Sequence, residues 1–261
     1  MKKPLILITN DDGINSPGVR AVAEAVNDLG DILIVAPVCQ QTSMGRSFPK
    51  SADVGIIEKR PFYIDGREIM AYAVHGSPAL AVSHAVLELC DRKPDLCISG
   101  INYGENLGLS ITCSGTVGAA FEADSHGIPS IAISRQVDLE SQHSNDFRNL
   151  DWTTCKYTTR YLVQHVLKYG LADGISILNV NVPEDATCTS EMRITKQGRH
   201  NYSAFIKPES RDMDKSYTLK SRINLNADEI DKESDIYAVV FDKVISITPL
   251  TWNLSVHMDK I

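Results

Sequence analysis

Three groups of oxygen-bearing side chains follow apolar runs that are typical of buried β-strands. They are Asp11 and Asp12 after the run 5–9, Thr42 and Ser43 after the run 32–36, and Asn102 after the run 96–99. In open parallel α/β sheets, ligands bind in the crevice beyond the carboxyl ends of the strands. We therefore expect these side chains to meet at one edge of a sheet and to form a binding site there.

The adjacent carboxylates of Asp11 and Asp12 repel each other unless a positive group lies near them. A hard divalent cation such as Mg²⁺ or Mn²⁺ supplies that charge and prefers carboxylate, hydroxyl and amide oxygens. Thr42 or Ser43, together with the Asn102 amide, completes such a set of ligands. No His pair or Cys cluster stands near these strand ends, which disfavours zinc. An Asn-Asp-Asp-Gly segment is also typical of a solvated turn, and the sequence alone leaves both interpretations open.

A second group of residues indicates an anion site. Ser114, Gly115 and Thr116 stand at the start of a predicted helix over 115–125, where hydroxyls and free backbone N–H groups bind phosphate. The segment 102–108 alternates Asn and Gly, which suits a loop around a ligand with Asn106 pointing inward. The alternatives are a plain helix cap for the first segment and an ordinary mobile loop for the second.

The first 135 residues alternate predicted strands and helices. The runs 5–9 and 32–36 flank a helix that Ser16 and Pro17 begin, and Gly30 is predicted as its left-handed C-cap. This strand-helix-strand unit requires its two strands to be parallel. Further along the chain, Asp65-Gly66 predicts a hairpin turn, and the pattern over 152–169 predicts a long helix that Gly170 ends.

The chain changes character after Pro183. Short β-like pieces at 192–195, 237–240 and 244–248 alternate with polar stretches. We therefore predict an α/β core over 1–183 and a β-rich extension over 184–261, which packs on the core or reaches a neighbouring subunit. The basic and aromatic segment 196–202 is most simply a solvated loop, with contact to a nucleotide as the alternative.

Composition restricts the class of partner. The 261 residues carry a formal net charge of −7, with 43% hydrophobic and 23% charged residues, as in ordinary globular proteins. An acidic chain disfavours a nucleic-acid polymer or an anionic membrane as the partner. No segment approaches the ~20 apolar residues of a membrane span. The apolar run near the N-terminus is too short for a signal peptide, and the six cysteines form no Cys-x-x-Cys, so we expect a cytoplasmic protein.

Five motifs stand in a fixed order along the chain. They are Leu-Ile-Thr-Asn-Asp-Asp-Gly at 7–13, Val-Ala-Pro at 35–37, Gly-Ser-Pro-Ala at 76–79, Ser-Gly-Ile-Asn-Tyr-Gly-Glu-Asn-Leu-Gly at 99–108 and Ser-Gly-Thr-Val-Gly-Ala-Ala at 114–120. In this order they resemble the SurE family of survival-protein 5′/3′-nucleotidases. The resemblance implies a Rossmann-like three-layer α/β core with a mostly parallel sheet. It also implies a β-rich C-terminal arm that is exchanged in homodimers or homotetramers.

The same resemblance implies an activity and a set of site residues. The activity is divalent-metal-dependent hydrolysis of nucleoside 5′- and 3′-monophosphates, and in some cases of short polyphosphate. One divalent cation per subunit, Mg²⁺ or Mn²⁺ with Ca²⁺ as a crystal substitute, is implied. Its ligands fall on Asp11, Asp12, Thr42 and Asn102, with Ser43 as the alternative hydroxyl. From the residues themselves, we expect Asp11, Asp12 and Asn102 to be catalytic, and Asn106, Ser114, Gly115 and Thr116 to hold the phosphate. The chain departs from the family at Cys113, where a Tyr is usual.

A binding module without turnover is the rival interpretation. A receiver domain also carries an acidic pair after its first strand, binds Mg²⁺ and has a doubly wound sheet. It needs in addition a phospho-accepting Asp at another central strand end and a later Lys. Here those strand ends carry Ser99, Asn102, Ser134 and Arg135. The sequence therefore favours the hydrolase.

Overall fold

A nine-stranded sheet runs through the centre of the molecule, in the order β3-β4-β2-β1-β5-β6-β7-β11-β8. The computed structural model describes residues 2–138, 142 and 147–255. The strands are β1 (Leu5–Thr9), β2 (Asp31–Pro37), β3 (Ile57–Ile64), β4 (Arg67–Val74), β5 (Leu96–Tyr103), β6 (Ser130–Arg135), β7 (Ile177–Val182), β8 (Met192–Ile194) and β11 (Ile245–Leu250). Strands β4, β2, β1, β5, β6 and β7 are parallel to their neighbours in this order, and β3 and β11 are antiparallel to β4 and β7.

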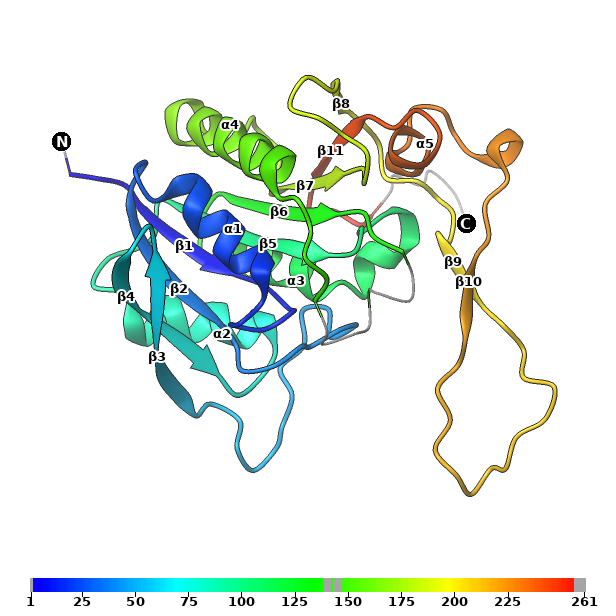
Figure 1. Cartoon of the computed structure of the whole chain (residues 1–261), viewed down its shortest axis with the longest axis horizontal. Coiled ribbons are helices and arrows are strands. Elements are labelled where there is room, and N and C mark those ends of the chain that lie inside the picture. Colours follow the sequence, from blue (N-terminus) through cyan, green and yellow to red (C-terminus); the bar gives the residue numbers. More distant parts are fainter. Residues whose placement is uncertain (1, 139–141, 143–146, 256–261) are drawn as a thin grey trace.

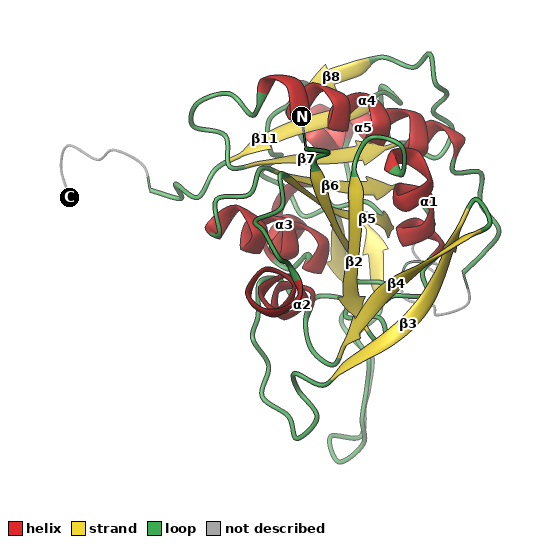
Figure 2. Ribbon diagram, turned by 90° about the vertical axis from the view of Figure 1, so that its left-hand side faces the viewer, coloured by secondary structure: helices red, strands yellow, loops and turns green. Residues whose placement is uncertain are grey.

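Helices cover both faces of the sheet (Figures 1 and 2). One face carries α1 (Pro17–Val26) and α4 (Thr153–Tyr169), and the other carries α2 (Pro78–His84) and α3 (Gly115–Ser125). The short helix α5 (Asp235–Val240) packs beside β11. Single turns form η1 (Ala85–Leu89), η2 (Gly108–Thr112) and η3 (Ala227–Glu229). The predicted three-layer α/β fold with a mostly parallel sheet is confirmed.

The central strand β1 shows why the apolar runs had to be continuous. Ile6 and Ile8 belong to the core on the α1 and α4 side of the sheet, and Leu7 belongs to the core on the α2 and α3 side. All three are fully buried. Successive side chains of a strand point to opposite faces, so a strand covered on both faces needs apolar residues at every position. Each such burial contributes about 1.5–3 kcal/mol of transfer free energy.

Local sequence signals placed several elements correctly. The Ser16 hydroxyl accepts a hydrogen bond from the Gly18 N–H at the start of α1. Helix α3 spans the predicted residues 115–125, and α4 ends at Gly170, whose φ of 76° places it in the left-handed region. The Asp65-Gly66 hairpin also forms, because the residues on either side of the turn pair across β3 and β4.

Two local predictions were wrong. Helix α1 already ends at Val26, so Gly30 is not its C-cap. Gly30 is required for a different reason, since a Cβ there would lie 2.5 Å from the Pro4 carbonyl oxygen. The segment 237–240 forms part of α5 instead of a strand. The Ser234 hydroxyl accepts from the Tyr237 N–H and begins that helix, so the cap prevails over the β-propensity of Tyr and Val.

A two-stranded hairpin stands apart from the main sheet (Figure 1). It pairs β9 (Ser203–Phe205) with β10 (Ser221–Ile223) and carries the connecting residues 206–220 outward. We call residues 203–223 the arm. The other strands after residue 183, β8 and β11, extend the main sheet. The division of the chain at residue 183 therefore stays a prediction.

None of the helices in the described residues is both long enough and apolar enough to pass through a lipid bilayer.

Candidate active site

A pocket of about 500 Å³ opens where β1 and β5 end. Its lining includes seven residues singled out from the sequence, namely Asp11, Asp12, Thr42, Ser43, Asn102, Asn106 and Ser114. A larger pocket of about 660 Å³ lies near Lys3 and Asp31, at the amino end of β2. Ligands of open α/β sheets bind at the carboxyl ends of strands, and the predicted residues converge there. We therefore take the smaller pocket as the candidate active site.

Asp11 and Asp12 are buried, with 7% and 6% of the residue surface exposed. The Thr116 hydroxyl donates to Asp11 Oδ1 over 2.5 Å. Asp12 Oδ2 accepts from the Tyr103 backbone N–H at 2.9 Å, and Asp12 Oδ1 accepts from the Gln40 amide at 3.4 Å. No Lys or Arg of the described residues forms an ion pair with either carboxylate.

This burial raises the pKa of both carboxyl groups. For Asp12, the negative charge of Asp11 raises the pKa further, while the hydrogen bonds from Tyr103 and Gln40 oppose the shift. For Asp11, the Thr116 hydroxyl gives the largest opposing effect. Two buried carboxylates without a cation are costly in free energy. The donor set therefore fits a divalent cation, which would neutralise both charges.

Asn102 lines the pocket, and its side-chain carbonyl oxygen accepts no hydrogen bond from the described residues. Its side-chain N–H donates to the Gly104 carbonyl over 2.6 Å, which leaves Oδ1 available as a ligand. The chain reaches this position through an irregularity in β5, where the pairing with β6 shifts register between Ser99 and Asn102. Gly100 makes the shift possible, because its φ is 134° and a Cβ there would lie 2.2 Å from the Ile133 carbonyl oxygen.

Thr42 and Ser43 line the pocket and stand on an exposed loop. The Gln41 N–H ties this loop to the turn that follows β1 by donating to the Asp11 backbone carbonyl over 2.6 Å. Ser43 has a φ of 62°, in the left-handed region. Both side chains line the pocket, so the choice of hydroxyl ligand stays open between them.

The start of α3 touches both the pocket and Asp11. Ser114 lines the pocket, and its hydroxyl accepts from the Val117 N–H at 3.1 Å as the helix N-cap. Gly115 lies against Asp11, since a Cβ at this position would be 2.7 Å from the Asp11 Cβ. The Thr116 hydroxyl is engaged by Asp11. Of the three predicted phosphate-binding residues at this helix start, two thus contact the carboxylate directly.

The amide of Asn106 belongs to a buried polar network that the sequence did not reveal. Its side-chain N–H donates to Ser134 over 2.9 Å, and its backbone N–H donates to Asn181 over 2.8 Å. Its carbonyl accepts from Asn179 and Asn181 on β7. The two β7 asparagines alternate with apolar residues in a fully buried strand, which was the available signal.

Several other lining residues were missed. Glu105 is buried in the pocket wall, where desolvation raises its pKa, and it accepts from Gln142 at 3.1 Å. Tyr202 belongs to the segment 196–202, for which contact with a nucleotide was the alternative to a solvated loop, and it is buried and lines the pocket. The arm adds Ser203, Phe205 and Ser221. Its strands are three residues long, too short for a periodic signal.

The ligand chemistry of the site is dominated by oxygen. The described residues contain no group of three or more His, Cys, Asp or Glu side chains placed to hold a metal. A cation here would depend on two carboxylates completed by neutral oxygens. This is the pattern that Mg²⁺ and Mn²⁺ accept and that zinc sites rarely use.

Replacing Gly115 by Ala is expected to displace Asp11, because the added Cβ would lie 2.8 Å from Asp11 Oδ2. A displacement of about 1 Å at a reacting centre lowers the rate on the order of 100-fold. Steady-state rates measured with saturating substrate and metal will check this. Circular dichroism and the thermal midpoint must show a folded variant, and a folded variant with the wild-type rate would contradict the assignment of Asp11.

Comparison with known proteins identifies the family of the chain. The family model described as "Survival protein SurE" matches residues 6–204. The chain belongs to the SurE family. A 5′-nucleotidase SurE of Thermococcus gammatolerans is 36% identical over 254 residues, covering 97% of this chain and 92% of the relative. A 5′-nucleotidase SurE of Methanothermobacter thermautotrophicus is 44% identical over 204 residues, covering 77% of this chain and 76% of the relative.

A solved SurE structure shares the architecture. The crystal structure of the SurE protein from Aquifex aeolicus superimposes with a TM-score of 0.74 at 30% identity, and covers 97% of this chain and 95% of its own. The resemblance seen in the five sequence motifs is thereby confirmed over nearly the whole chain. The oxygen donors gathered in the pocket are of the kind that divalent cations prefer.

Proposed function

We propose that this SurE protein is a divalent-metal-dependent 5′-nucleotidase, a phosphoric monoester hydrolase that converts nucleoside 5′-monophosphates to nucleoside and phosphate. We extend the proposal to 3′-monophosphates and short polyphosphate. The observation that carries it is the buried pair Asp11 and Asp12, uncompensated by any cationic side chain of the described residues and adjacent to the start of α3. The names of the SurE relatives support the substrate class.

The proposed roles follow from the contacts. Asp11, Asp12, Asn102 and the Thr42 hydroxyl would hold one Mg²⁺ or Mn²⁺ per subunit. Such a cation would supply Lewis-acid polarisation of a phosphoryl oxygen and a more acidic water. Thr116 and the Tyr103 N–H orient the two carboxylates.

The remaining phosphate oxygens are assigned to the other predicted residues. The Ser114 hydroxyl lines the pocket at the start of α3 and is assigned to a phosphate oxygen, where its O–H can donate to a developing negative charge. The Val117 N–H at this helix start is already used by Ser114. Asn106 adds a side chain that the β6 and β7 network holds in place. Gly115 leaves the helix start free of a side chain.

Phosphate release tests the function. Adenosine 5′- and 3′-monophosphate and tripolyphosphate are incubated with the protein and Mg²⁺, Mn²⁺ or Ca²⁺, with a chelator as the control. We expect release from the 5′-monophosphate that needs metal and stops with the chelator. Absence of release from every substrate with every metal would refute the proposal. A stable acyl-phosphate after incubation with acetyl phosphate would instead favour the receiver-like module.

Thr42→Ala is expected to raise the Mn²⁺ concentration needed for half-maximal activity by roughly 10–100-fold, the range seen when metal-site support is lost. Ser43→Ala is the matched control, because both residues are exposed on the same loop and both substitutions remove the hydroxyl, from Thr42 together with one methyl group. Titration of the activity with Mn²⁺ measures both. The reverse ranking would assign the hydroxyl ligand to Ser43.

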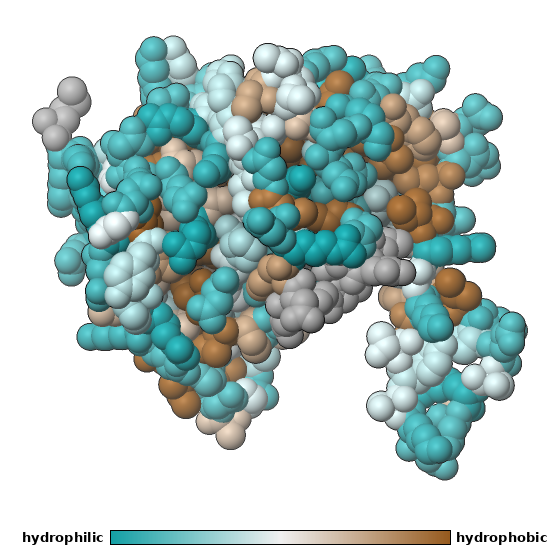
Figure 3. Space-filling model, viewed as in Figure 1, coloured by the Kyte–Doolittle hydropathy of each residue, from teal (hydrophilic) through white to brown (hydrophobic). Residues whose placement is uncertain are grey.

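We also propose that the arm packs on a second copy of the chain in a homodimer or homotetramer. The arm stands away from the body, with hydrophobic side chains near its root (Figure 3). Phe205, Met213 and Ile223 are 74%, 79% and 51% exposed, although apolar surface of this kind is usually covered in oligomers. Light scattering on the whole chain and on a variant lacking 206–220 tests this. We expect a dimer or tetramer that the deletion converts to a monomer, and a monomeric whole chain would contradict it.

A further inference from the structure

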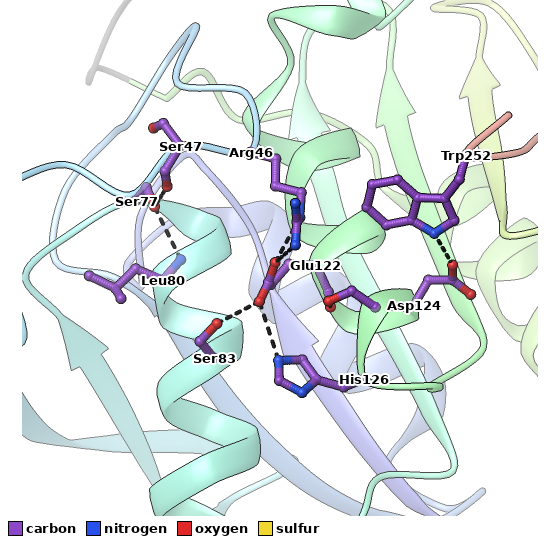
Figure 4. Close-up of polar contacts among 10 residues, drawn as sticks. Arg46, Ser47, Ser77, Leu80, Ser83, Glu122, Asp124, His126 and Trp252 are labelled. Atoms are coloured by element: carbon purple, nitrogen blue, oxygen red, sulfur yellow. Dashed lines mark hydrogen bonds and ion pairs between the residues drawn. The ribbon is translucent and has the colours of Figure 1, made fainter. Parts of the chain in front are cut away.

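A buried acid in α3 forms a polar cluster outside the pocket (Figure 4). Glu122 is 4% exposed, and both of its carboxylate oxygens are used. Arg46 contacts Oε2 through two guanidinium nitrogens, each at 2.7 Å. Ser83 donates to Oε1 over 2.6 Å, and His126 Nε2 lies 3.2 Å from the same oxygen. This set of contacts fixes the carboxylate from three elements of the chain.

The guanidinium of Arg46 is held on its other side by aromatic rings. It lies over the Trp252 ring at 5.1 Å and over the Phe48 ring at 5.8 Å. Trp252 is itself anchored to α3, because its indole N–H donates to Asp124 and its ring packs against Phe121 with centroids 4.7 Å apart. A planar guanidinium is suited to being paired and stacked at once, which a Lys ammonium is not.

The backbone next to Arg46 lies directly on α3. The Gly45 N–H donates to the Cys113 carbonyl over 2.9 Å. A Cβ at Gly118 would lie 2.4 Å from the Gly45 carbonyl carbon and 2.6 Å from the Arg46 nitrogen. This close contact joins the loop that carries Thr42 to the same helix whose first residues hold Asp11.

We propose that Arg46 and Glu122 are positioning residues that hold the Thr42–Arg46 loop on α3 and so set the affinity of the site for its divalent cation. The inference rests on the proposed function for the identity of that cation. The pair touches neither substrate nor metal. It acts by fixing the distance between the hydroxyl on the loop and the carboxylate beside the helix, and small errors in such a support weaken a site strongly.

The test uses the full-length protein and three variants. Glu122→Gln keeps the shape of the buried side chain, and Arg46→Lys keeps the charge. Arg160→Lys is the matched control, because Arg160 also pairs with a carboxylate through two nitrogens and is 39% exposed, against 40% for Arg46. Arg160 lies on α4, across the sheet from α3.

Two readouts separate positioning from plain stabilisation. The first is amide hydrogen exchange at Gly45 in the metal-free protein. We expect this exchange to accelerate at least several-fold in both Arg46→Lys and Glu122→Gln. The second is the dissociation constant for Mn²⁺ measured by calorimetry, which we expect to rise on the order of ten-fold. The rate at saturating Mn²⁺ should stay within about two-fold of wild type, because the bound cation restores the loop. Arg160→Lys should change none of these values.

The results show whether the Arg46–Glu122 pair sets the affinity for Mn²⁺ or is only structural. Wild-type Mn²⁺ affinity and wild-type exchange at Gly45 in a folded Arg46→Lys variant would show that the pair is only structural. If Glu122→Gln fails to fold, Arg46→Lys alone decides. If the wild-type protein binds no Mn²⁺, the proposed function fails together with the link to metal affinity. Faster exchange in the variants would then uphold only the contact of the loop with α3, and unchanged exchange would overturn that as well.

Discussion

Replacing Asp12 by Asn is expected to lower metal-dependent phosphate release on the order of 1,000-fold, while making the metal-free protein more stable. The loss follows from removing one carboxylate ligand, since a catalytic metal contributes several kcal/mol and each 1.36 kcal/mol is ten-fold in rate. The gain in stability follows because the substitution removes one of two adjacent buried carboxylates, whose burial and mutual repulsion are unfavourable in the folded metal-free protein. Initial rates and urea unfolding at pH 8 in chelator measure the two effects.

Asp235→Asn provides a matched control for this prediction. The Asp235 carboxylate is also fully buried, but it accepts backbone N–H bonds from Gly108, Gly198 and Ile236. In Asp235→Asn, the side-chain NH₂ group of the new Asn would face a backbone N–H, which cannot turn away. In Asp12→Asn, the side-chain NH₂ group can face Gln40, whose amide can rotate and accept through its oxygen. We therefore expect Asp235→Asn to destabilise the protein. A destabilised Asp12→Asn in chelator would contradict the account of the carboxylate pair.

Added Mn²⁺ is expected to stabilise the protein, and to do so more at higher pH. Burial raises the pKa of Asp11 to about 6 and that of Asp12 to about 7, from 3.8. The unfolded chain therefore releases these protons at lower pH than the folded one. It follows that the metal-free protein loses stability as pH rises from about 4 to about 7, and that its stability is then constant with respect to these groups.

Cation binding reverses this loss, because the folded state binds Mn²⁺ best when both carboxyls are ionised. Mn²⁺ at 100 times its dissociation constant adds about 2.7 kcal/mol, which corresponds to on the order of 5–10 °C in the midpoint for a chain of this size. Thermal unfolding at pH 5 and pH 8, with Mn²⁺ and with chelator, measures it. An equal shift at both pH values would exclude Asp11 and Asp12 as the coupled groups.

The parts of the fold that sequence predicts well are those fixed by neighbouring residues. Ser16 caps α1, Ser114 caps α3 and Gly170 ends α4 through contacts within one or two turns. The apolar run of β1 likewise reports its own burial on both faces. Such signals need no knowledge of distant segments, so a single sequence carries them.

The parts it predicts poorly depend on contacts between distant segments. The Thr116 hydroxyl is used by Asp11, 105 positions away, although its place at a helix start indicated phosphate binding. Gly30 is required by its close contact with the Pro4 carbonyl, and not by the end of the preceding helix. The asparagines of β7 meet Asn106, and the residues of the arm reach the pocket, only through the tertiary fold. The hydrophobic periodicity of a single segment does not predict which distant segment it contacts.

Helix α3 has a broader consequence for the chemistry of the pocket. Its 11 residues span about 16 Å at 1.5 Å each, and they link the Asp11 carboxylate at one end to the indole of Trp252 near the other. A chain shortened after Leu250 would keep all nine strands of the main sheet and yet lose that indole. We therefore expect the loss of Trp252 to be felt at the Asp11 end of α3, although the indole itself contacts the opposite end of that helix.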